Sequence, residues 1–247
     1  MMKGKIFVIG LGPGDPGNMT VRAYQAIESC QVLVGYTVYI EQVRELSQGK
    51  EIIKKGMGQE VERGKIALEK ALEGNTVGVV CSGDAGVYGM AGLILELLKD
   101  HGEREQISCE VIPGITSALS CSSLLGAPIV EDFCTISLSD YMTPWERIMT
   151  RLENACAGDF TIALYNPRSL ARPEYLHKAM DVVKKYRHGD TPVGIVRNAY
   201  REDQSIVITK LTDFDPESVD MFCTVIIGNS KTYVAHGRMI TSRGYQL

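Results

Sequence analysis

Residues 10–20 read GLGPGDPGNMT and follow a short apolar run, an arrangement typical of a ligand-binding turn between a strand and a helix. The dinucleotide pattern GxGxxG requires glycine at its first, third and sixth positions. Gly10 and Gly12 satisfy the first two, but Asp15 occupies the sixth, where a carboxylate repels a pyrophosphate. No lysine followed by Ser or Thr completes a P-loop. These residues disfavour a nucleotide site or an NAD-dependent enzyme and leave open a tight structural turn, with Asn18 or Thr20 near the next helix cap.

Two further turns of small residues follow apolar runs. Residues 81–89 read CSGDAGVYG and residues 112–117 read IPGITS, each leading into a helical pattern. In an open α/β sheet, ligands bind outside the carboxyl ends of the strands, so we expect the three turns to converge on one edge. Asp84 is placed to accept a hydrogen bond from a hydroxyl or an amine. The alternative is that these glycines serve only the turns themselves.

Cysteine and histidine spacing gives no metal or disulfide framework. The seven cysteines are scattered without a CxxC pair, which predicts buried free thiols and a reducing, cytoplasmic setting. The four histidines show no ligand spacing, so we expect surface residues and no protein-bound metal. The cysteines are Cys30, Cys81, Cys109, Cys121, Cys134, Cys156 and Cys223, and the histidines are His101, His177, His188 and His236.

The elements that carry these turns alternate between strand and helix in the first half. Short runs rich in Val and Ile, without strict alternation, predict strands covered on both faces and a mainly parallel α/β sheet. The predicted strands are 5–10, 31–35, 51–55, 76–81 and 108–112, and the predicted helices are 18–30, 60–73, 86–99 and 116–125.

The sequence Gly126-Ala-Pro128 interrupts this rhythm, so we place a boundary there between two α/β domains, residues 1–125 and 126–247. A short polar loop separates the runs at 193–197 and 205–209, which predicts an antiparallel pair and a mixed sheet in the second domain. The other predicted strands are 133–138, 160–165 and 222–228, and the predicted helices are 144–155 and 173–186.

Composition excludes two classes of partner. A net charge of −4 carries no electrostatic footprint for nucleic acid. No apolar run approaches the roughly 18–20 residues that a membrane helix needs, and the N-terminus turns polar too early for a signal peptide.

Five motifs in order carry a family resemblance: GLGPGDPGNMT, SGDAGVYGMAG, VIPGITSALS, ALYNPRS and VDMFCTVIIGNS. They resemble the tetrapyrrole methylases of cobalamin biosynthesis over essentially the whole chain. Further stretches, among them ISLSDYMTPWE, LYNPRSLARPEYL and TPVGIVRNAYRE, are most similar to the members that methylate carbon 17 of a precorrin-3 type macrocycle and contract its ring.

The resemblance implies two α/β domains with the methyl donor S-adenosylmethionine in a cleft between them, a tetrapyrrole substrate and a homodimer. A sulfonium donor without a phosphate agrees with the failed dinucleotide pattern. Carried over motif by motif, the implied donor-binding residues are Pro13, Ser82, Gly83, Asp84, Val87, Thr116, Ser117, Tyr165, Asn166, Ala199 and Thr224.

Methyl transfer needs alignment and exclusion of water rather than a side-chain nucleophile, since an electron-rich carbon of the macrocycle attacks. Ring contraction also needs proton transfer, for which Asp15, Asp84, Asp140 and Glu146 are the candidates. The loop carrying Trp145 is a candidate cover for the macrocycle. Alternatively, Pro144 starts a helix, Trp145 packs in the core and Glu146 favours the first turn.

The substrate's acetate and propionate groups are suited to bidentate pairing with arginine. The candidates are Arg168, Arg172, Arg197 and Arg201, the alternative for each being a solvated surface position. Two other functions stay open: a sister methylase acting on another macrocycle carbon, and a protein that binds a corrinoid without catalysis. No cysteine cluster suggests an iron–sulfur cofactor. We favour a cobalt-loaded substrate over a metal-free one.

Overall fold

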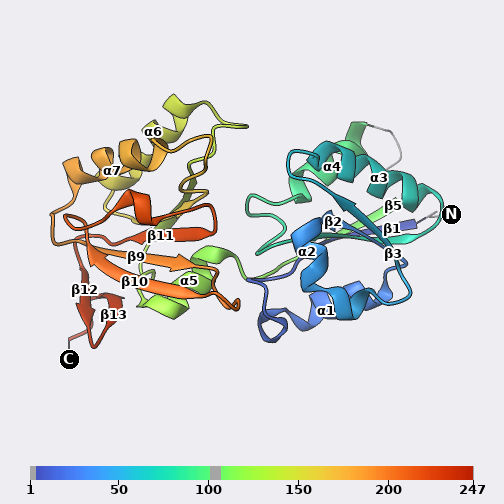
Figure 1. Ribbon diagram of the computed structural model, residues 1–247, viewed down its shortest axis with the longest axis horizontal. Helices are drawn as coiled ribbons and strands as arrows, with labels where there is room; N and C mark the ends of the chain where they lie inside the picture. The colour runs from blue at the N-terminus through green and yellow to red at the C-terminus, as the bar shows by residue number, and fades with distance from the viewer. Residues whose placement is uncertain (1–3, 101–106, 247) are drawn as a thin grey trace. The chain divides into compact units, whose positions relative to one another are not determined.

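The computed structural model describes residues 4–100 and 107–246, which form two compact units, Met1–Thr116 and Ser117–Leu247 (Figure 1). The division lies before helix α5 (Ser117–Leu125) and not at residue 126, where we predicted it. The physical reason is packing: Ala118 and Cys121 of α5 are buried against Ala163 and Ile226 of the second unit. The sequence Gly126-Ala-Pro128 therefore marks the end of a helix and not the boundary between units.

A parallel five-stranded sheet forms the centre of the first unit, as predicted. Its strands are β1 (Gly4–Gly10), β2 (Val32–Tyr36), β3 (Glu51–Lys55), β4 (Thr76–Cys81) and β5 (Ile107–Ile112). Their order is β3-β2-β4-β1-β5, so β1 lies between β4 and β5.

Helices cover both faces of this sheet (Figure 1). They are α1 (Val21–Ser29), α2 (Thr37–Gln42), α3 (Glu60–Leu72) and α4 (Ala91–Asp100), with short 3-10 turns at Pro16–Asn18 and Arg44–Ser47. Alternate residues of β1 serve the two faces. Val8 packs in the cluster that contains Ala67 of α3, whereas Ile9 packs in the cluster that contains Ile27 of α1. This double coverage explains why the strands lack a polar face.

In the first unit, a side-chain cap sets the start of one helix and a turn sets the start of another. The hydroxyl of Thr20 accepts a hydrogen bond from the Ala23 N–H at 3.1 Å, so α1 begins at Val21, beside one of the two caps we predicted. Helix α4 begins at Ala91 and not at Gly86, because the intervening residues form a turn in which Tyr88 has a φ of +54°. Helix α2 was not predicted.

The second unit contains a mixed sheet, as predicted. Its strands are β7 (Phe133–Ser137), β8 (Thr161–Tyr165), β9 (Pro192–Arg197), β10 (Ser205–Lys210) and β11 (Cys223–Ile227). The order is β10-β9-β11-β8-β7, and the predicted antiparallel pairing of β9 with β10 is confirmed. Strand β11 runs antiparallel to both β8 and β9.

Helices α6 (Trp145–Ala157) and α7 (Tyr175–Tyr186) cover one face of the mixed sheet, and α5 covers the other (Figure 1). A 3-10 turn spans Pro216–Ser218. A second, small sheet was not predicted because its strands are very short: β6 (Gly126–Ala127), β12 (Thr232–Ala235) and β13 (Arg238–Thr241). The Thr241 hydroxyl donates to the carbonyl of Pro128 at 2.6 Å.

Arg187 is a buried cation inside the second unit. Its guanidinium donates to the carbonyls of Cys156 at 2.7 Å, Phe160 at 2.9 Å and Gly228 at 3.3 Å, and it lies 3.2 Å from a carboxylate oxygen of Asp159. These contacts join the end of α6 and the start of β8 to the turn after β11, so the arginine stabilises the fold and not a surface site.

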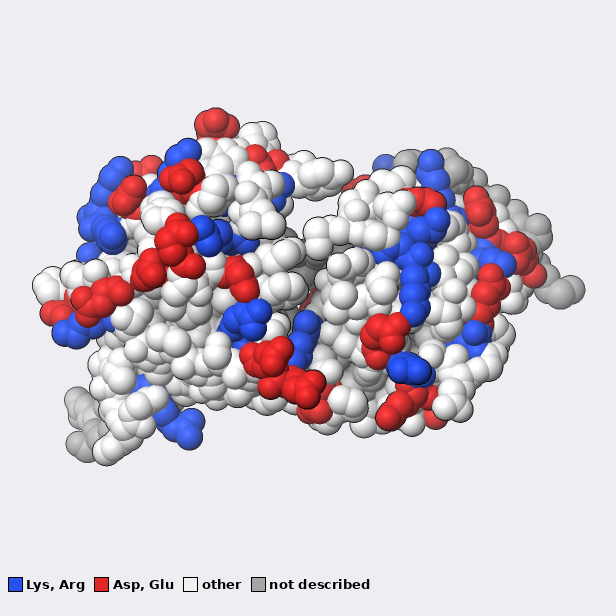
Figure 2. All heavy atoms as spheres, in the orientation of Figure 1, with Lys and Arg blue, Asp and Glu red and all other residues white. Residues whose placement is uncertain are grey.

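All seven cysteines are free thiols; five are buried, as predicted, whereas Cys109 and Cys134 are only partly buried. None of the helices in residues 4–100 and 107–246 is long and apolar enough to cross a membrane. Positive and negative side chains are interspersed on the face shown in Figure 2.

Candidate active site

The three turns that we predicted to converge do so at one edge of the first sheet. Gly10 of β1 is in register with Cys81 of β4, and Ile9 is in register with Ile112 of β5, so the chain leaves all three strands at the same level. Beyond the strands, Gly12 and Gly83 exchange two backbone hydrogen bonds, at 3.0 and 2.8 Å. The turns therefore form a single connected structure.

Glycine is required here by contact between turns. A Cβ atom at Gly114 would lie 2.1 Å from the carbonyl oxygen of Gly83, and one at Gly10 would lie 2.7 Å from the Gly114 nitrogen. Gly12 and Gly83 also have left-handed φ angles of +75° and +65°. The close contacts and the left-handed φ angles give these glycines a structural role in the turns.

Asp84 holds the second and third turns together. One carboxylate oxygen accepts the backbone N–H groups of Gly86 at 2.8 Å and Val87 at 3.2 Å, and the other accepts that of Gly114 at 3.0 Å. In all three hydrogen bonds the carboxylate is the acceptor, which is the role of an ionised carboxylate. This geometry gives Asp84 a role in positioning the turns and argues against it as a proton donor.

Asp15 has a different environment from Asp84. Its carboxylate accepts a hydrogen bond from the neutral side-chain amide of Asn18 at 3.0 Å, and the residue is only partly buried. The preceding Pro13 is buried, which fixes the turn on which Asp15 stands. The first unit contains two acid–base candidates. Asp84 joins two turns through its carboxylate, whereas the hydrogen bond of Asp15 stays within its own turn.

A second edge, in the second unit, collects the other predicted donor residues. Since β11 is antiparallel to both β8 and β9, the last residues of those two strands and the first residues of β11 lie at the same edge, beside the end of β7. Register pairs Ser137 with Tyr165, and Arg197 with Cys223. Tyr165, Asn166, Ala199 and Thr224 are at or next to this edge.

Hydrogen bonds fix several of these groups. The Tyr165 hydroxyl accepts the Ala118 N–H at the start of α5 at 2.8 Å, and the Asn166 amide donates to the Ser137 hydroxyl at 2.9 Å. Asn166 and Asn198 have left-handed φ angles of +49° and +48°, a conformation that asparagine tolerates better than most residues. Ser137 lies in the ISLSDYMTPWE stretch but was not predicted as a site residue.

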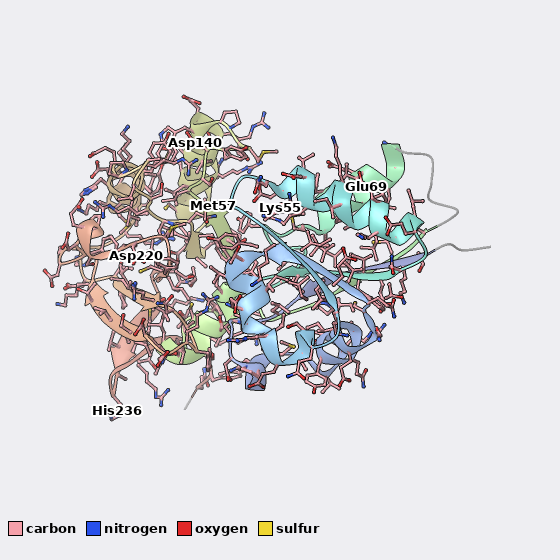
Figure 3. All side chains as sticks on the ribbon, turned by 45° about the vertical axis from the view of Figure 1, so that its right-hand side comes forward. Lys55, Met57, Glu69, Asp140, Asp220 and His236 are labelled. Carbon is pink, nitrogen blue, oxygen red and sulfur yellow. The ribbon has the colours of Figure 1, made fainter. Side chains whose placement is uncertain are left out.

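Three loops at this edge are tied together by ion pairs. They are residues 138–144 after β7, 166–174 after β8 and 215–222 before β11. Arg172 pairs with Asp140 at 2.5 Å, and Arg168 pairs with Glu217. Figure 3 labels Asp140 and Asp220, which belong to two different loops.

Asp140 also accepts a hydrogen bond from the Tyr175 hydroxyl at 2.6 Å. This hydrogen bond, together with the Arg172 guanidinium, holds the pKa of Asp140 below its usual value. An acid held ionised by two donors is poorly suited to donating a proton, which argues against Asp140 as a general acid. Tyr175 was not predicted.

The predicted substrate-binding arginines already have partners within the chain. Besides the pairs of Arg168 and Arg172, Arg197 bonds to Asp220 at 2.9 Å. The backbone N–H of Arg201 donates to the carbonyl of Asn198 at 2.9 Å and closes the turn after β9. Substrate carboxylates would have to compete with Asp and Glu for the first three arginines.

Trp145 follows the alternative that we left open. It is the first residue of α6, after Pro144, and its ring lies 4.0 Å from that of Tyr175 between centroids and packs against the core. Glu146 is exposed in the first turn of the helix, where a negative charge is favourable. These positions argue against Trp145 as a cover for a ligand and give Glu146 a structural role.

The histidines do not gather. His177 pairs with Glu217 at 2.8 Å, whereas His188 and His236 are exposed, the latter on the turn between β12 and β13 (Figure 3). His101 lies outside the described residues. Within the described part of the chain, no group of three His, Cys, Asp or Glu side chains is placed to hold a metal ion.

Comparison with known proteins accounts for this pattern of turns and edges. The profile of Tetrapyrrole (Corrin/Porphyrin) Methylases matches residues 5–215. The chain belongs to the tetrapyrrole methylase family. The match includes all three turns of the first unit and the motif around Tyr165, although it ends before Thr224.

Two relatives of this tetrapyrrole methylase are similar over nearly its whole length. The cobalt-factor III methyltransferase of Priestia megaterium is 47% identical over 99% of the chain, which spans 46% of that protein's length. The probable cobalt-factor III C(17)-methyltransferase of Salmonella typhimurium is 45% identical, covering 97% of this chain and 99% of that protein.

A solved structure has the same fold. The crystal structure of the methyltransferase CobJ superposes with a TM-score of 0.93 at 34% identity, covering 97% of this chain and 100% of the other. The α/β arrangement predicted for a tetrapyrrole methylase, with a parallel sheet followed by a mixed one, is thereby confirmed.

Proposed function

We propose that the chain catalyses S-adenosylmethionine-dependent methylation of carbon 17 of a precorrin-3 type macrocycle, with contraction of the ring, in cobalamin biosynthesis. The observation that carries this proposal is the identity of 47% and 45% to relatives named for cobalt-factor III methylation, over nearly all of this chain. The cobalt in both names supports a cobalt-loaded substrate over a metal-free one, with the metal entering as part of the substrate.

The predicted donor-binding residues fit S-adenosylmethionine by their chemistry. Hydroxyls of Ser82, Ser117, Tyr165 and Thr224 and the amide of Asn166 offer neutral hydrogen-bonding partners for ribose hydroxyls, an adenine ring and an amino-acid group. The turns that carry Ser82 and Gly83 are held by backbone bonds and present no lysine or arginine for a phosphate. When bound, S-adenosylmethionine supplies a methyl group, which the nucleophilic carbon of the macrocycle takes as the C–S bond breaks.

The chain's own contribution is alignment and proton transfer. Reactants held in line at about 3–3.5 Å gain most of the rate that methyl transfer needs. Asp84 fixes two of the turns by accepting three backbone N–H groups, which keeps their geometry constant. For the proton moved during ring contraction we propose Asp15. Asp84 and Asp140 join turns or loops and Glu146 lies in the first turn of a helix, whereas the partly buried carboxylate of Asp15 accepts a hydrogen bond from the neighbouring Asn18.

We also propose a homodimer and a cytoplasmic location. Support for the dimer is the edge strand β10, on which Ile206 and Val207 are exposed next to a groove of about 840 Å³ lined in part by Tyr233 and Val234. Sedimentation at several concentrations tests it, and a Val207→Lys variant that stays as dimeric as the wild type would remove this edge from the interface. Support for a reducing compartment is the free state of all seven cysteines.

Equilibrium binding and an anaerobic assay test the enzymatic proposal. Calorimetry with S-adenosylhomocysteine should give saturable binding, and its absence would favour a protein that carries a corrinoid without catalysis. An anaerobic assay should compare cobalt-factor III with precorrin-3B, with the product mass and its methyl position as readouts. Methylation of another carbon would instead identify a sister methylase, and turnover of only precorrin-3B would overturn the cobalt assignment.

A further inference from the structure

Exposed apolar side chains gather on the three tied loops at the edge of the mixed sheet. Met142 is 85% exposed and Tyr141 69% in the first loop, Leu170 is fully exposed in the second, and Phe222 is 53% exposed in the third. Apolar side chains left in solvent on adjacent loops are a mark of a binding surface. We call these four residues the apolar rim.

Ion pairs and a hydrogen bond connect the loops that carry the rim. The pair of Arg172 and Asp140 joins the loop of Leu170 to the loop of Tyr141 and Met142. Arg168 joins the loop of Leu170 to the loop of Phe222, through Glu217 and through the carbonyl of Val219. The rim residues therefore belong to one cross-linked assembly of loops.

Charge on the rim is balanced, which limits what it can attract. Three arginines lie in or beside the loops, but each is paired with a carboxylate, and the Arg197 guanidinium also lies 5.7 Å from the centroid of the Phe222 ring. A surface whose cations are neutralised binds through apolar area more than through net charge. The arginines therefore serve to position the loops.

We propose that the apolar rim binds the flat, conjugated face of the tetrapyrrole macrocycle, and that the three paired arginines act as positioning residues for the rim. The proposal rests on the function proposed above and specifies which surface recognises the substrate. A tetrapyrrole fits because it presents a broad apolar face for Tyr141, Met142 and Leu170, and aromatic rings stack on such faces. The rim also lies at the sheet edge that carries Tyr165 and Asn166, the predicted donor-binding residues.

The test compares a double variant, Tyr141→Ser with Met142→Ser, against a control double variant, Val61→Ser with Tyr245→Ser. All four positions are more than half exposed in this chain, with Val61 at 51% and Tyr245 at 76%, so both proteins should fold. The readouts are the KM and kcat for cobalt-factor III, the Kd for S-adenosylhomocysteine and the melting temperature.

We expect the rim variant to raise the KM for cobalt-factor III about tenfold, equivalent to about 1.4 kcal/mol, with an unchanged Kd for S-adenosylhomocysteine. The control should match the wild type. An unchanged KM in the rim variant overturns the proposal, as does a Leu170→Ser variant that also leaves the KM unchanged. If the wild type itself turns over no macrocycle, the proposed function fails and the rim's role fails with it.

A positioning role for the arginines predicts a separate pattern. Arg172→Lys cannot reproduce the bonding geometry of the guanidinium, so it should raise the KM for cobalt-factor III in the way the rim variant does. Combining Arg172→Lys with the rim variant should raise the KM little further, because both changes weaken the same contact between the rim and the macrocycle. Fully additive effects, or a rim variant that turns a dimer into a monomer, would contradict the proposal, the latter by showing that a second copy covers the rim.

Discussion

The carboxylate of Asp84 accepts a hydrogen bond of 3.0 Å from the backbone N–H of Gly114, thirty residues farther along the chain. This bond joins the turn after β4 to the turn after β5, and the same carboxylate also caps Gly86 and Val87. Gly114 and Asp84 are therefore both needed for the close contact between these two turns.

Replacement of Asp84 by Asn tests the carboxylate. An amide presents one acceptor and one donor, so either the Gly114 N–H or those of Gly86 and Val87 would face another donor. We expect the free energy of unfolding to fall by about 1–3 kcal/mol and the affinity for S-adenosylhomocysteine to fall with it. Urea unfolding and calorimetry measure both, with Asp181→Asn on the exposed side of α7 as the control. A stable variant that binds normally would contradict the role of Asp84.

Gly114→Ala tests the close approach of the turns. The new Cβ would lie 2.1 Å from the carbonyl oxygen of Gly83, so backbone must shift. We expect the variant to be destabilised by more than about 2 kcal/mol or to lose donor binding. The matched control is Gly92→Ala in α4, where a Cβ meets nothing within 4 Å and alanine should stabilise the helix by about 0.5–1 kcal/mol. Equal unfolding midpoints for the two variants would refute the packing argument.

The sequence predicted the strands well because each is a short Val- and Ile-rich run between turn signals, as at 51–55 and 76–81. It did not predict the late start of α4, because residues 86–90 are compatible with a helix. A tertiary bond from Asp84 to Gly114 and a left-handed Tyr88 decide otherwise. Local propensity cannot report a hydrogen bond to a residue thirty positions away.

Tyr175→Phe tests the environment of Asp140. The substitution removes the hydroxyl that lowers the pKa of Asp140 but keeps the ring against Trp145. We expect the pKa of Asp140 to rise toward 3.8, as read from carboxylate NMR shifts. Because the pKa is lower in the folded chain than in the unfolded one, Asp140 stabilises the fold above that value and loses this contribution as the pH falls through its folded pKa. The variant should therefore lose less stability than the wild type when acidified.

Tyr186→Phe provides the control for this titration. The Tyr186 hydroxyl, at the end of α7, donates a hydrogen bond to the carboxylate of Glu153 in α6. The pKa of Asp140 should not change in that variant. A shift of similar size in both variants would mean that the change is not specific to the Tyr175 contact.

Thiol reactivity tests the predicted state of the cysteines. Burial raises the pKa of Cys30 to about 12 and those of Cys81, Cys121, Cys134 and Cys223 to about 11, which leaves little reactive thiolate near neutral pH. We expect slow labelling of the native protein by a thiol reagent at pH 8 and release of seven thiols after unfolding. Fast labelling of several cysteines in the native protein would show that the interior opens readily.

Arg187→Met tests the buried cation. The change leaves the carbonyls of Cys156, Phe160 and Gly228 without the donor that they share. We expect a loss of about 3–5 kcal/mol in the free energy of unfolding. The comparison is Arg151→Met on the exposed side of α6, which should stay within about 0.5 kcal/mol of the wild type. Equal urea midpoints for the two variants would contradict the structural role.

The candidate site was only partly predictable for a related reason. Motifs located the turns and the residues at strand ends, including Asp15, Tyr165 and Asn166, because these positions follow apolar runs. Glu217 lies in a loop with no motif, and Asp220 stands within VDMFCTVIIGNS without any sign of its ion pair, because a charged residue in a loop is ordinarily solvated. The sequence therefore identified the three arginines and Asp140 as site candidates, but not Glu217 or Asp220 and not the pairing between the arginines and these carboxylates.

Strand β13 has a consequence for synthesis on the ribosome. Met239 and Ile240 pair with Gly126 and Ala127, and Thr241 bonds to Pro128, which precedes it by 113 residues. Every strand of the first sheet leaves the exit tunnel before helix α5 does, whereas the backbone just after α5 can pair only when almost the last residues of the chain have emerged. During that interval the nascent second unit has an open edge at β6, and this is the stage at which a translating chain is most exposed to aggregation.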